Sequence, residues 1–327
     1  MRWLGRPPHD RRPRRCAVVF GGRTAVSADP TGWWAAAPPL GVLEYLDLDD
    51  DRPVRLKRRA AFASTLLAED LGYRRLWIPE HHGTGVPSTN PALLAAVLAS
   101  HTTRIRVGTA VNLARVRDPH LVAEDLVTAG SFAGDRLDVG FGRGDVSGPA
   151  ATALAGLRKD DVATEAAIGT AVAALRGGCD WIDPLEVPCQ MWMHGAGTRS
   201  AELAARWEFH YCHAMFFNPD LDACASTLAR YRAGFPGGRT AVAVAVVAND
   251  DARTARTDGL RAGISVGCAG TARQCAATIE ALLDGSGADE VVLTELSRDA
   301  GDHHRALRDI HAHVAGARRS ACGGGPR

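Results

Sequence analysis

The chain has 327 residues, of which 46% are hydrophobic and 23% charged, enough for one large domain with a substantial core. Its net charge of +1 gives no electrostatic sign of binding to nucleic acid or to a membrane, and no apolar run is long enough to span a bilayer. The 8 cysteines are scattered without a C-x-x-C pair, which favours a reduced, cytoplasmic protein.

The two ends of the chain differ in composition from the rest. Residues 1–23 are rich in arginine and proline, and their one apolar run is too short for a signal-peptide core. We therefore expect residues 1–38 to form a disordered basic leader. Residues 39–316 are expected to form the folded domain, and the Gly/Arg-rich residues 317–327 a flexible tail.

From residue 40 onward, short apolar strands alternate with amphipathic helices. The expected strands cover residues 40–47, 74–78, 104–111, 136–141, 187–193, 210–215, 241–248 and 290–294. The expected helices cover residues 54–71, 91–100, 119–132, 160–176, 198–207, 219–233, 271–283 and 303–314. Such a long series of strand–helix units exceeds what a doubly wound sheet usually sustains. It predicts an α/β fold of the (β/α)8 TIM-barrel type.

Polar and glycine-rich residues follow several of the expected strands, and the carboxyl ends of barrel strands meet at one mouth. The second strand runs through Pro79 into a cluster of one glutamate and two histidines. The residues expected at the mouth are Glu80, His81, His82, Ala110, Val111, Asn112, Gly142, Arg143, Gly144, His194, Gly195, Ala196, Gly197 and Ser200.

The residue with the clearest chemical potential is His81, because an imidazole titrates near neutral pH and can act as acid, base or hydrogen-bond donor. One alternative is that Glu80, His81 and His82 form only a solvated polar turn. Another is that they bind a metal ion. Neighbouring side chains on an extended segment point to opposite sides, so we expect no metal here.

Arg143 and the segment from Gly195 to Ser200 predict an anion site. Arg143 lies between two glycines, which allow a ligand to approach the backbone, and its guanidinium suits a phosphate. Gly195 to Ser200 opens a helix whose free amides attract an anion. The alternative for residues 140–144 is a plain tight turn. The glycine spacing does not match a dinucleotide-binding fingerprint.

Several segments together resemble the luciferase-like flavin-dependent monooxygenases, over roughly residues 40–314. The segments are LAEDLGYRRLWIPEHHG, NPALLAAVLASHTTRIRVGTAV, DPHLVAEDLVTAGSFAGDRLDVGFGRG and, more weakly, RSAELAARWEF. The resemblance implies a (β/α)8 barrel that binds reduced FMN and activates O2, usually as a homodimer. It also implies a separate reductase that delivers the reduced flavin.

The resemblance assigns roles to individual residues. It places the active-site histidine at His81, in the E-H-H motif, and the arginine that contacts the FMN phosphate at Arg143. It implies a non-prolyl cis peptide under the flavin ring between Ala110 and Val111. The cofactor positions it implies are Glu80, Ala110, Val111, Arg143, Gly195, Ala196, Gly197 and Ser200.

The sequence also departs from the family pattern. Gly197 stands where a hydroxyl residue is frequent, and the second basic phosphate ligand has no clear match, so Arg158 or Lys159 is a candidate. Residues 249–266 look too short for the lid that relatives often carry. The expected function is an FMNH2-dependent monooxygenase acting on a small organic substrate. The alternatives are a catalytically inactive flavin-binding barrel and a deazaflavin-dependent oxidoreductase, with the E-H-H motif favouring FMN.

Overall fold

The computed structural model describes residues 37–45, 52–83 and 85–322. Apart from residues 37 and 38, the expected leader lies outside the described residues. Helix α11 (Ala300–Cys322) is longer than expected, because it runs on through part of the segment expected as a flexible tail.

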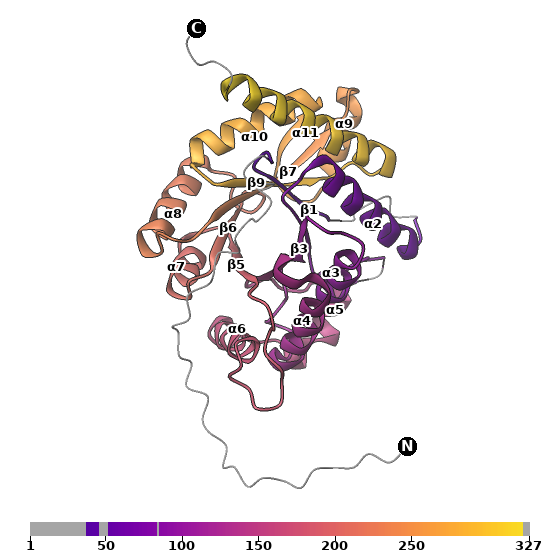
Figure 1. Cartoon of the computed structure of the whole chain (residues 1–327). Coiled ribbons are helices and arrows are strands. Elements are labelled where there is room, and N and C mark those ends of the chain that lie inside the picture. Colours follow the sequence, from indigo (N-terminus) through magenta and orange to yellow (C-terminus); the bar gives the residue numbers. More distant parts are fainter. Residues whose placement is uncertain (1–36, 46–51, 84, 323–327) are drawn as a thin grey trace, which may run out of the picture.

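Parallel strands form the centre of the molecule, with the helices around them (Figure 1). The strands are β1 (Leu40–Leu43), β2 (Arg75–Ile78), β3 (Arg106–Thr109), β4 (Leu137–Phe141), β5 (Gln190–Gly195), β6 (His210–Ala214), β7 (Thr240–Ala248), β8 (Val266–Gly270) and β9 (Glu290–Glu295). Strands β1 to β7 pair in chain order, and β9 pairs with both β7 and β1. These pairings close an eight-stranded barrel, so the predicted (β/α)8 fold is confirmed.

Helices follow the strands of the barrel in sequence. They are α2 (Val54–Leu71), α3 (Pro91–Ala99), α4 (Pro119–Ala133), α5 (Gly148–Ala153), α6 (Asp161–Leu175), α7 (Thr198–Arg206), α8 (Leu221–Gly234), α9 (Ala252–Arg261), α10 (Ala272–Ser286) and α11. The sequence contains the signals that set their ends. Asn90 and Asp118 accept hydrogen bonds from backbone amides at the starts of α3 and α4. Gly72, at φ 94°, ends α2 in a left-handed conformation.

The floor of the barrel, at the amino ends of the strands, holds a buried cluster of charges. Arg75 donates to Asp138 at 2.5 Å and to Glu290 at 2.8 Å, and Arg106 donates to Asp138 at 2.7 Å. The aromatic ring of Trp77 lies against this cluster, and its indole nitrogen donates to Asp138. We call Arg75, Arg106, Asp138 and Glu290 the floor cluster.

The short helix α5 was not expected from the sequence, and neither were two elements between β7 and α10. Residues 249–266 were expected as a short connection, but they contain helix α9 and lead into β8, which pairs with the carboxyl half of β7. Ala241 and Ala243 of β7 pack inside the barrel, so Ala245 and Val247 face the same way. Because Ala255 of α9 packs on these residues, α9 covers part of the mouth.

The long helices of the described segments lack the apolar run that a bilayer crossing needs.

Candidate active site

His81 lies in the loop that leaves β2 at the mouth of the barrel. Its backbone amide donates to the carbonyl of Ser88 at 2.9 Å, which closes the loop. Its imidazole ring packs edge-on against the ring of Tyr45, with 4.8 Å between centroids. Tyr45 follows β1 and also packs on the apolar cluster beneath α9. The half-buried imidazole of His81 is thus next to the part of the mouth that α9 covers.

The carboxylate of Glu80 connects this loop to neighbouring segments. Its buried carboxylate accepts a hydrogen bond from the Leu113 amide at 3.0 Å and lies 2.8 Å from the His82 ring nitrogen Nε2. The Arg117 guanidinium lies 3.6 Å away. These contacts tie the end of β2 to the loop after β3, so Glu80 and His82 form a unit that holds the loop. The assignment of Glu80 as a cofactor contact stays a prediction.

The ends of β3 and β4 meet beside this loop. The peptide bond between Ala110 and Val111 is cis, as expected. The Val111 side chain lies over Gly142, where an added Cβ would come within 3.3 Å of it. An added Cβ on Gly144 would come within 2.7 Å of Leu113. The glycines on both sides of Arg143 therefore let the two strand ends pack closely.

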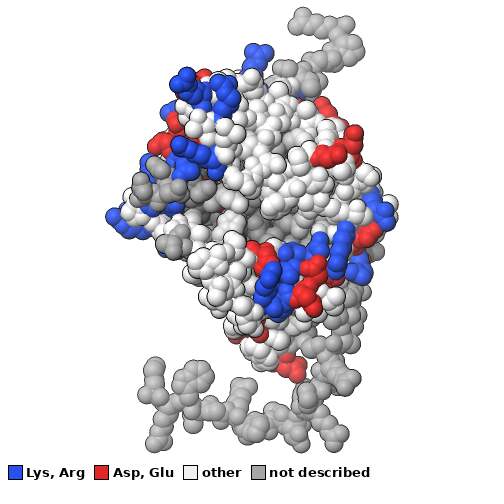
Figure 2. Space-filling model, turned by 180° about the vertical axis from the view of Figure 1, so that it is seen from behind, with Lys and Arg blue, Asp and Glu red and all other residues white. Residues whose placement is uncertain are grey.

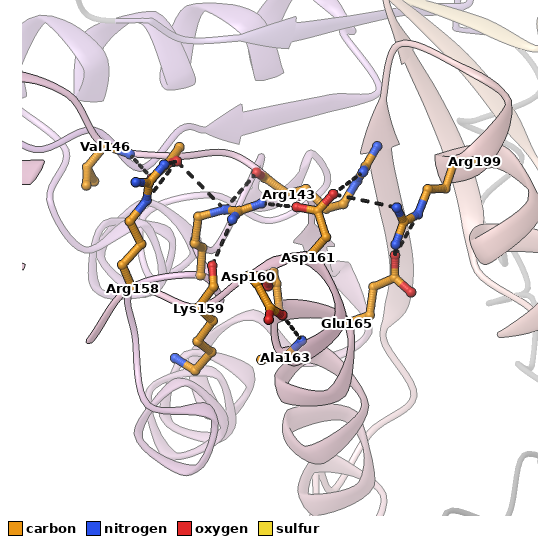
Figure 3. A network of polar contacts seen from close by, with 12 residues as sticks. Arg143, Val146, Arg158, Lys159, Asp160, Asp161, Ala163, Glu165 and Arg199 are labelled. Carbon is orange, nitrogen blue, oxygen red and sulfur yellow. Dashed lines mark hydrogen bonds and ion pairs between the residues drawn. The ribbon is translucent and has the colours of Figure 1, made fainter. Parts of the chain in front are cut away.

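Arg143 is part of a cluster of charges at the rim of the mouth (Figure 3). Its guanidinium donates to Asp161, the first residue of α6, at 2.9 Å. Arg115 also donates to Asp161, and Arg199 lies 3.6 Å from the same carboxylate. The hydrogen bonds from Arg115 and Arg143 lower the pKa of Asp161. We call Arg115, Arg143, Asp161 and Arg199 the rim cluster.

The rim cluster is exposed to solvent except at Arg115, whose side chain is 12% exposed. The side chains of Arg143, Asp161 and Arg199 are 31%, 40% and 53% exposed. On the α6–α7 side of the molecule, basic and acidic side chains alternate in a band beside a hollow in the surface (Figure 2). Three guanidinium groups converge on Asp161, while Arg199 also donates to Glu165 at 2.8 Å and Arg115 lies 3.9 Å from Asp145. The exposed guanidinium groups of Arg143 and Arg199 are therefore within reach of an anion that could replace a carboxylate partner.

The start of α7 adjoins the rim cluster through Arg199, the second residue of the helix. Gly197, at the N-cap position, provides no side chain to cap the amides of the first turn. Ser200 is buried in that turn, and its hydroxyl occupies the space that a side chain on Gly195 would need. The structure therefore brings Arg143 and the segment from Gly195 to Ser200 together.

Arg158 and Lys159, the candidates for a second basic ligand, have partners of their own. Arg158 pairs with Asp145, and the Lys159 ammonium donates to the Arg117 carbonyl at 2.9 Å. Neither is bonded to Asp161, where Arg115 and Arg199 converge with Arg143. Partial burial lowers the pKa of Lys159.

His194, expected at the mouth directly after the fifth strand, belongs to β5 itself. Its ring lies inside the barrel, 4.8 Å from the Trp77 ring, and burial lowers its pKa to about 3. The imidazole of His194 is therefore neutral. Among the described residues, no group of three or more His, Cys, Asp or Glu side chains is arranged to hold a metal ion.

Comparison with known proteins gives a family for this fold and site. The family model of luciferase-like monooxygenases matches residues 48–264. The chain belongs to the luciferase-like monooxygenase family. A luciferase-like monooxygenase from Escherichia coli K12 is 30% identical over 220 residues, which are 60% of this chain and 64% of that protein. The chain thus spans less than two thirds of this curated relative.

Solved structures of luciferase-like proteins share the fold. One is the oxygenating constituent of 3,6-diketocamphane monooxygenase from Pseudomonas putida, in complex with FMN. Its TM-score is 0.67 at 17% identity, covering 86% of this chain and 98% of that one. Another is an F420-dependent secondary alcohol dehydrogenase, with a TM-score of 0.65 at 14% identity, covering 85% of this chain and 99% of that one.

Sequence reasoning missed Tyr45, Arg115, Asp161 and Arg199 in this luciferase-like site. Arg199 stood within a segment already identified as a helix start, so its position was available from the sequence. Asp161 carried no comparable signal, because an acidic residue in the first turn of a helix is common and stabilises the helix dipole by itself. Its contact with three arginines arises only where the start of α6 meets the loops after β3 and β4 and the start of α7.

Proposed function

We propose that this chain is a monooxygenase that uses reduced FMN and O2 to oxygenate a small organic substrate. One observation supports this most strongly: the mouth combines a titratable imidazole, His81, with the cationic rim cluster and the uncapped start of α7. A phosphorylated ring system has chemical partners at both places. Family membership and the FMN-bound relative from Pseudomonas putida support the same proposal.

The residues at the rim fit a flavin phosphate. The amides in the first turn of α7 have no side-chain cap, and a Cβ added to Gly197 would meet no atom within 4 Å. Open space thus remains beside amides that can donate to an anion. Arg143 and Arg199 would pair with the phosphate, and Ser200 would fix the turn that presents the amides.

The remaining residues would control the reaction at the ring. Reduced FMN, when bound, supplies the electrons that activate O2. His81 would hold or transfer a proton at its imidazole nitrogen, while Tyr45 orients the imidazole. Helix α9 and the apolar residues Ala245 and Val247 would exclude water from this side of the mouth.

Two other functions remain as alternatives. The short connection after β7 and the missing hydroxyl residue at Gly197 had suggested an inactive flavin-binding barrel. Helix α9 occupies that connection and covers part of the mouth, which weakens the first of these two reasons. The F420-dependent structural relative supports a deazaflavin-dependent oxidoreductase. Titration of the protein with FMN and with F420 separates the two cofactors, and we expect tighter binding of FMN.

We also propose two protein partners. The first is a separate reductase, because the sequence lacks a fingerprint for binding a nicotinamide dinucleotide. The second is another copy of this chain. Helices α3 and α4 pack side by side (Figure 1). They expose the large apolar residues Leu93, Val97, Leu121 and Phe132. Sedimentation should show a dimer for the parent chain and a monomer for Phe132→Glu.

The test of the proposed reaction is rapid mixing of the protein–reduced FMN complex with O2. We expect a transient species that absorbs in the near ultraviolet before oxidised FMN appears. His81→Gln should bind FMN like the parent but release peroxide sooner. As a general acid or base, His81 should contribute roughly 10²–10⁴-fold to turnover once a substrate is known.

His82→Gln is the matched control, because a glutamine in this place can still bond to Glu80. It should behave like the parent in the rapid-mixing experiment. If the parent binds FMN but shows no transient species, the inactive barrel is the better description. If His81→Gln and the parent release peroxide at the same rate, His81 has no role at the reacting oxygen.

A further inference from the structure

Two cysteines lie side by side where β8 meets α10. Cys268 is in the middle of β8, and Cys275 is the fourth residue of α10. The Cys275 sulfur lies 3.9 Å from the Cys268 carbonyl oxygen and 3.7 Å from the Val247 carbonyl oxygen. The turn between them is fixed by Thr271, whose side chain caps α10 in a capping box. The Cys275 sulfur therefore lies against the backbone of Cys268, and the side chains of the two cysteines are in hydrogen-bond contact.

The two thiols differ in exposure and in acidity. Cys268 is half-buried, whereas Cys275 is fully buried. A hydrogen bond from the Cys275 thiol, with a further one from Thr278, lowers the pKa of Cys268 to about 6. The same hydrogen bond, together with burial, raises the pKa of Cys275. Of the two thiols, the accessible one is therefore the more acidic, which favours its reactive thiolate form.

Three buried cysteines provide a contrast. Cys189 and Cys224 are buried, and burial raises their pKa values to about 12 and about 11. Burial also raises the pKa of Cys212. Such thiols are protonated and inert towards oxidants at neutral pH.

We propose that Cys268 and Cys275 are a dithiol that hydrogen peroxide oxidises to a reversible disulfide. The Cys268 thiolate attacks one oxygen of peroxide, the O–O bond breaks, and Cys268 becomes a sulfenic acid as hydroxide leaves. The Cys275 sulfur then attacks the Cys268 sulfur, forming the S–S bond and releasing the second oxygen as water. The balance is two thiols and one peroxide to one disulfide and two waters.

The position of this pair connects it to the mouth. Strand β8 follows α9, which covers the inward face of β7, so a disulfide would fasten this covering segment to α10. Flavin enzymes that reduce O2 without transferring oxygen to substrate release peroxide, so an uncoupled turnover would supply the oxidant nearby. Only this source of peroxide rests on the proposed function, whereas the thiol chemistry does not.

The experiment uses the full chain, reduced beforehand and free of flavin, with one equivalent of added hydrogen peroxide. Free thiols are then alkylated and the protein is digested with trypsin. Cleavage after Arg273 separates the two cysteines, so a disulfide joins peptides 262–273 and 274–298. We expect this linked pair to be the main oxidation product and to disappear on treatment with a dithiol reductant. Its absence, or a dominant product at Cys179, would overturn the proposal.

Variants assign the roles of the two sulfurs. In Cys275→Ser, Cys268 should stop at the sulfenic acid, which a cyclic diketone traps. In Cys268→Ser, or in Cys268→Ala if the serine variant melts earlier than the parent, Cys275 should remain unoxidised.

Cys179→Ser is the matched control, because Cys179 is also half-buried, and it should form the disulfide at the parental rate. Equal oxidation of Cys275 with and without Cys268 would show that Cys268 is not the attacking thiol. Because no flavin is present, failure here would leave the proposed monooxygenase reaction unaffected.

Discussion

The floor cluster and the rim cluster pair the same kinds of side chains at opposite ends of one barrel. In the floor cluster, Arg75 and Asp138 have fully buried side chains. In the rim cluster, Arg143 and Asp161 are 31% and 40% exposed. Solvent and small anions can therefore reach the arginines of the rim but not those of the floor.

The comparison shows that burial, rather than residue type, decides what an arginine–carboxylate pair can do. At Asp138, burial alone would raise the pKa, but Arg106 and Arg75 outweigh it and lower the pKa. Such a cluster depends on every member, because loss of one partner leaves a buried charge unpaired. At the rim, water screens the charges, so a partner can be exchanged for a phosphate at little cost in stability.

We expect the largest loss of stability from a substitution in the floor cluster. Asp138→Asn leaves Arg75 and Arg106 short of one negative charge in a dry environment. We expect it to lower the free energy of unfolding by about 3–5 kcal/mol, measured by urea denaturation. Asp161→Asn at the rim is the matched control and should leave the urea midpoint close to that of the parent. Equal destabilisation by the two variants would mean that burial does not separate the clusters.

A third cluster of charged side chains tests whether burial or location in the barrel determines how much a charge pair stabilises the fold. It lies at the mouth, like the rim cluster, but is as buried as the floor cluster. His303 of α11 lies between two carboxylates, with 2.7 Å to Glu295 and 3.1 Å to Glu44. Burial alone would lower the pKa of His303, but Glu44 and Glu295 raise it to about 10. In the folded state the imidazole is therefore charged at neutral pH, whereas an unfolded histidine titrates near its ordinary value.

This raised pKa gives a pH dependence with a definite sign. A folded pKa above the unfolded one means that the stabilisation is fully present below about pH 6.5 and is lost as the pH rises through about 10. The difference in unfolding free energy between the parent and His303→Gln should therefore shrink between about pH 6 and pH 10. Urea denaturation at several pH values measures it. A difference that stays constant over this range would show that His303 is neutral in the folded protein.

The sequence predicted the barrel well because its signals are local. Alternating apolar strands and helices gave the eight strands of the barrel, and helix α2 was predicted with the bounds that the structure has. Prolines and N-cap residues such as Asn90 and Asp118 set helix starts through contacts with their own neighbours. Helix α9 was missed because its composition is polar. Only Ala255 among its residues is buried, so the helix lacks the series of apolar residues that indicated the other helices.

The sequence predicted only those residues of the candidate site that belong to a recognisable local motif. His81 and Arg143 could be placed at strand ends from the order of the strands. The grouping of Arg115, Asp161 and Arg199 depends on the packing of three separate segments, which no local pattern specifies. Similarly, the sequence could not show that Glu80 bonds to His82 and to the Leu113 amide, because that contact crosses from β2 to the loop after β3.

The next prediction concerns the exposed arginine itself. Arg143→Ala should weaken FMN binding by about 1.5–3 kcal/mol, the usual range for a charge-assisted hydrogen bond. Riboflavin, which lacks the phosphate, should bind both proteins alike. Fluorescence titration with each flavin measures this. Arg158→Ala is the matched control, since Arg158 pairs with Asp145 and not with Asp161. Equal losses for FMN and riboflavin would mean that Arg143 supports the loop rather than the phosphate.

The smallest expected effect has the opposite sign, and it comes from removing the carboxylate of the rim cluster. Asp161 occupies the guanidinium groups of Arg143 and Arg115, and its charge repels a phosphate. In Asp161→Asn the arginines remain but the competing charge is gone, so FMN should bind a few-fold more tightly while riboflavin binding is unchanged. Because the rim is exposed, this gain should shrink as the salt concentration rises.

Glu165→Gln is the control for this last variant, because Glu165 accepts from Arg199 at 2.8 Å but does not contact Arg143. It should change FMN binding less than Asp161→Asn does. If Asp161→Asn instead binds FMN more weakly, then Asp161 is needed to hold the arginines in place. In that case the rim cluster, like the floor cluster, would need its carboxylate to keep the arginines in position. The two clusters would then differ only in their exposure to solvent.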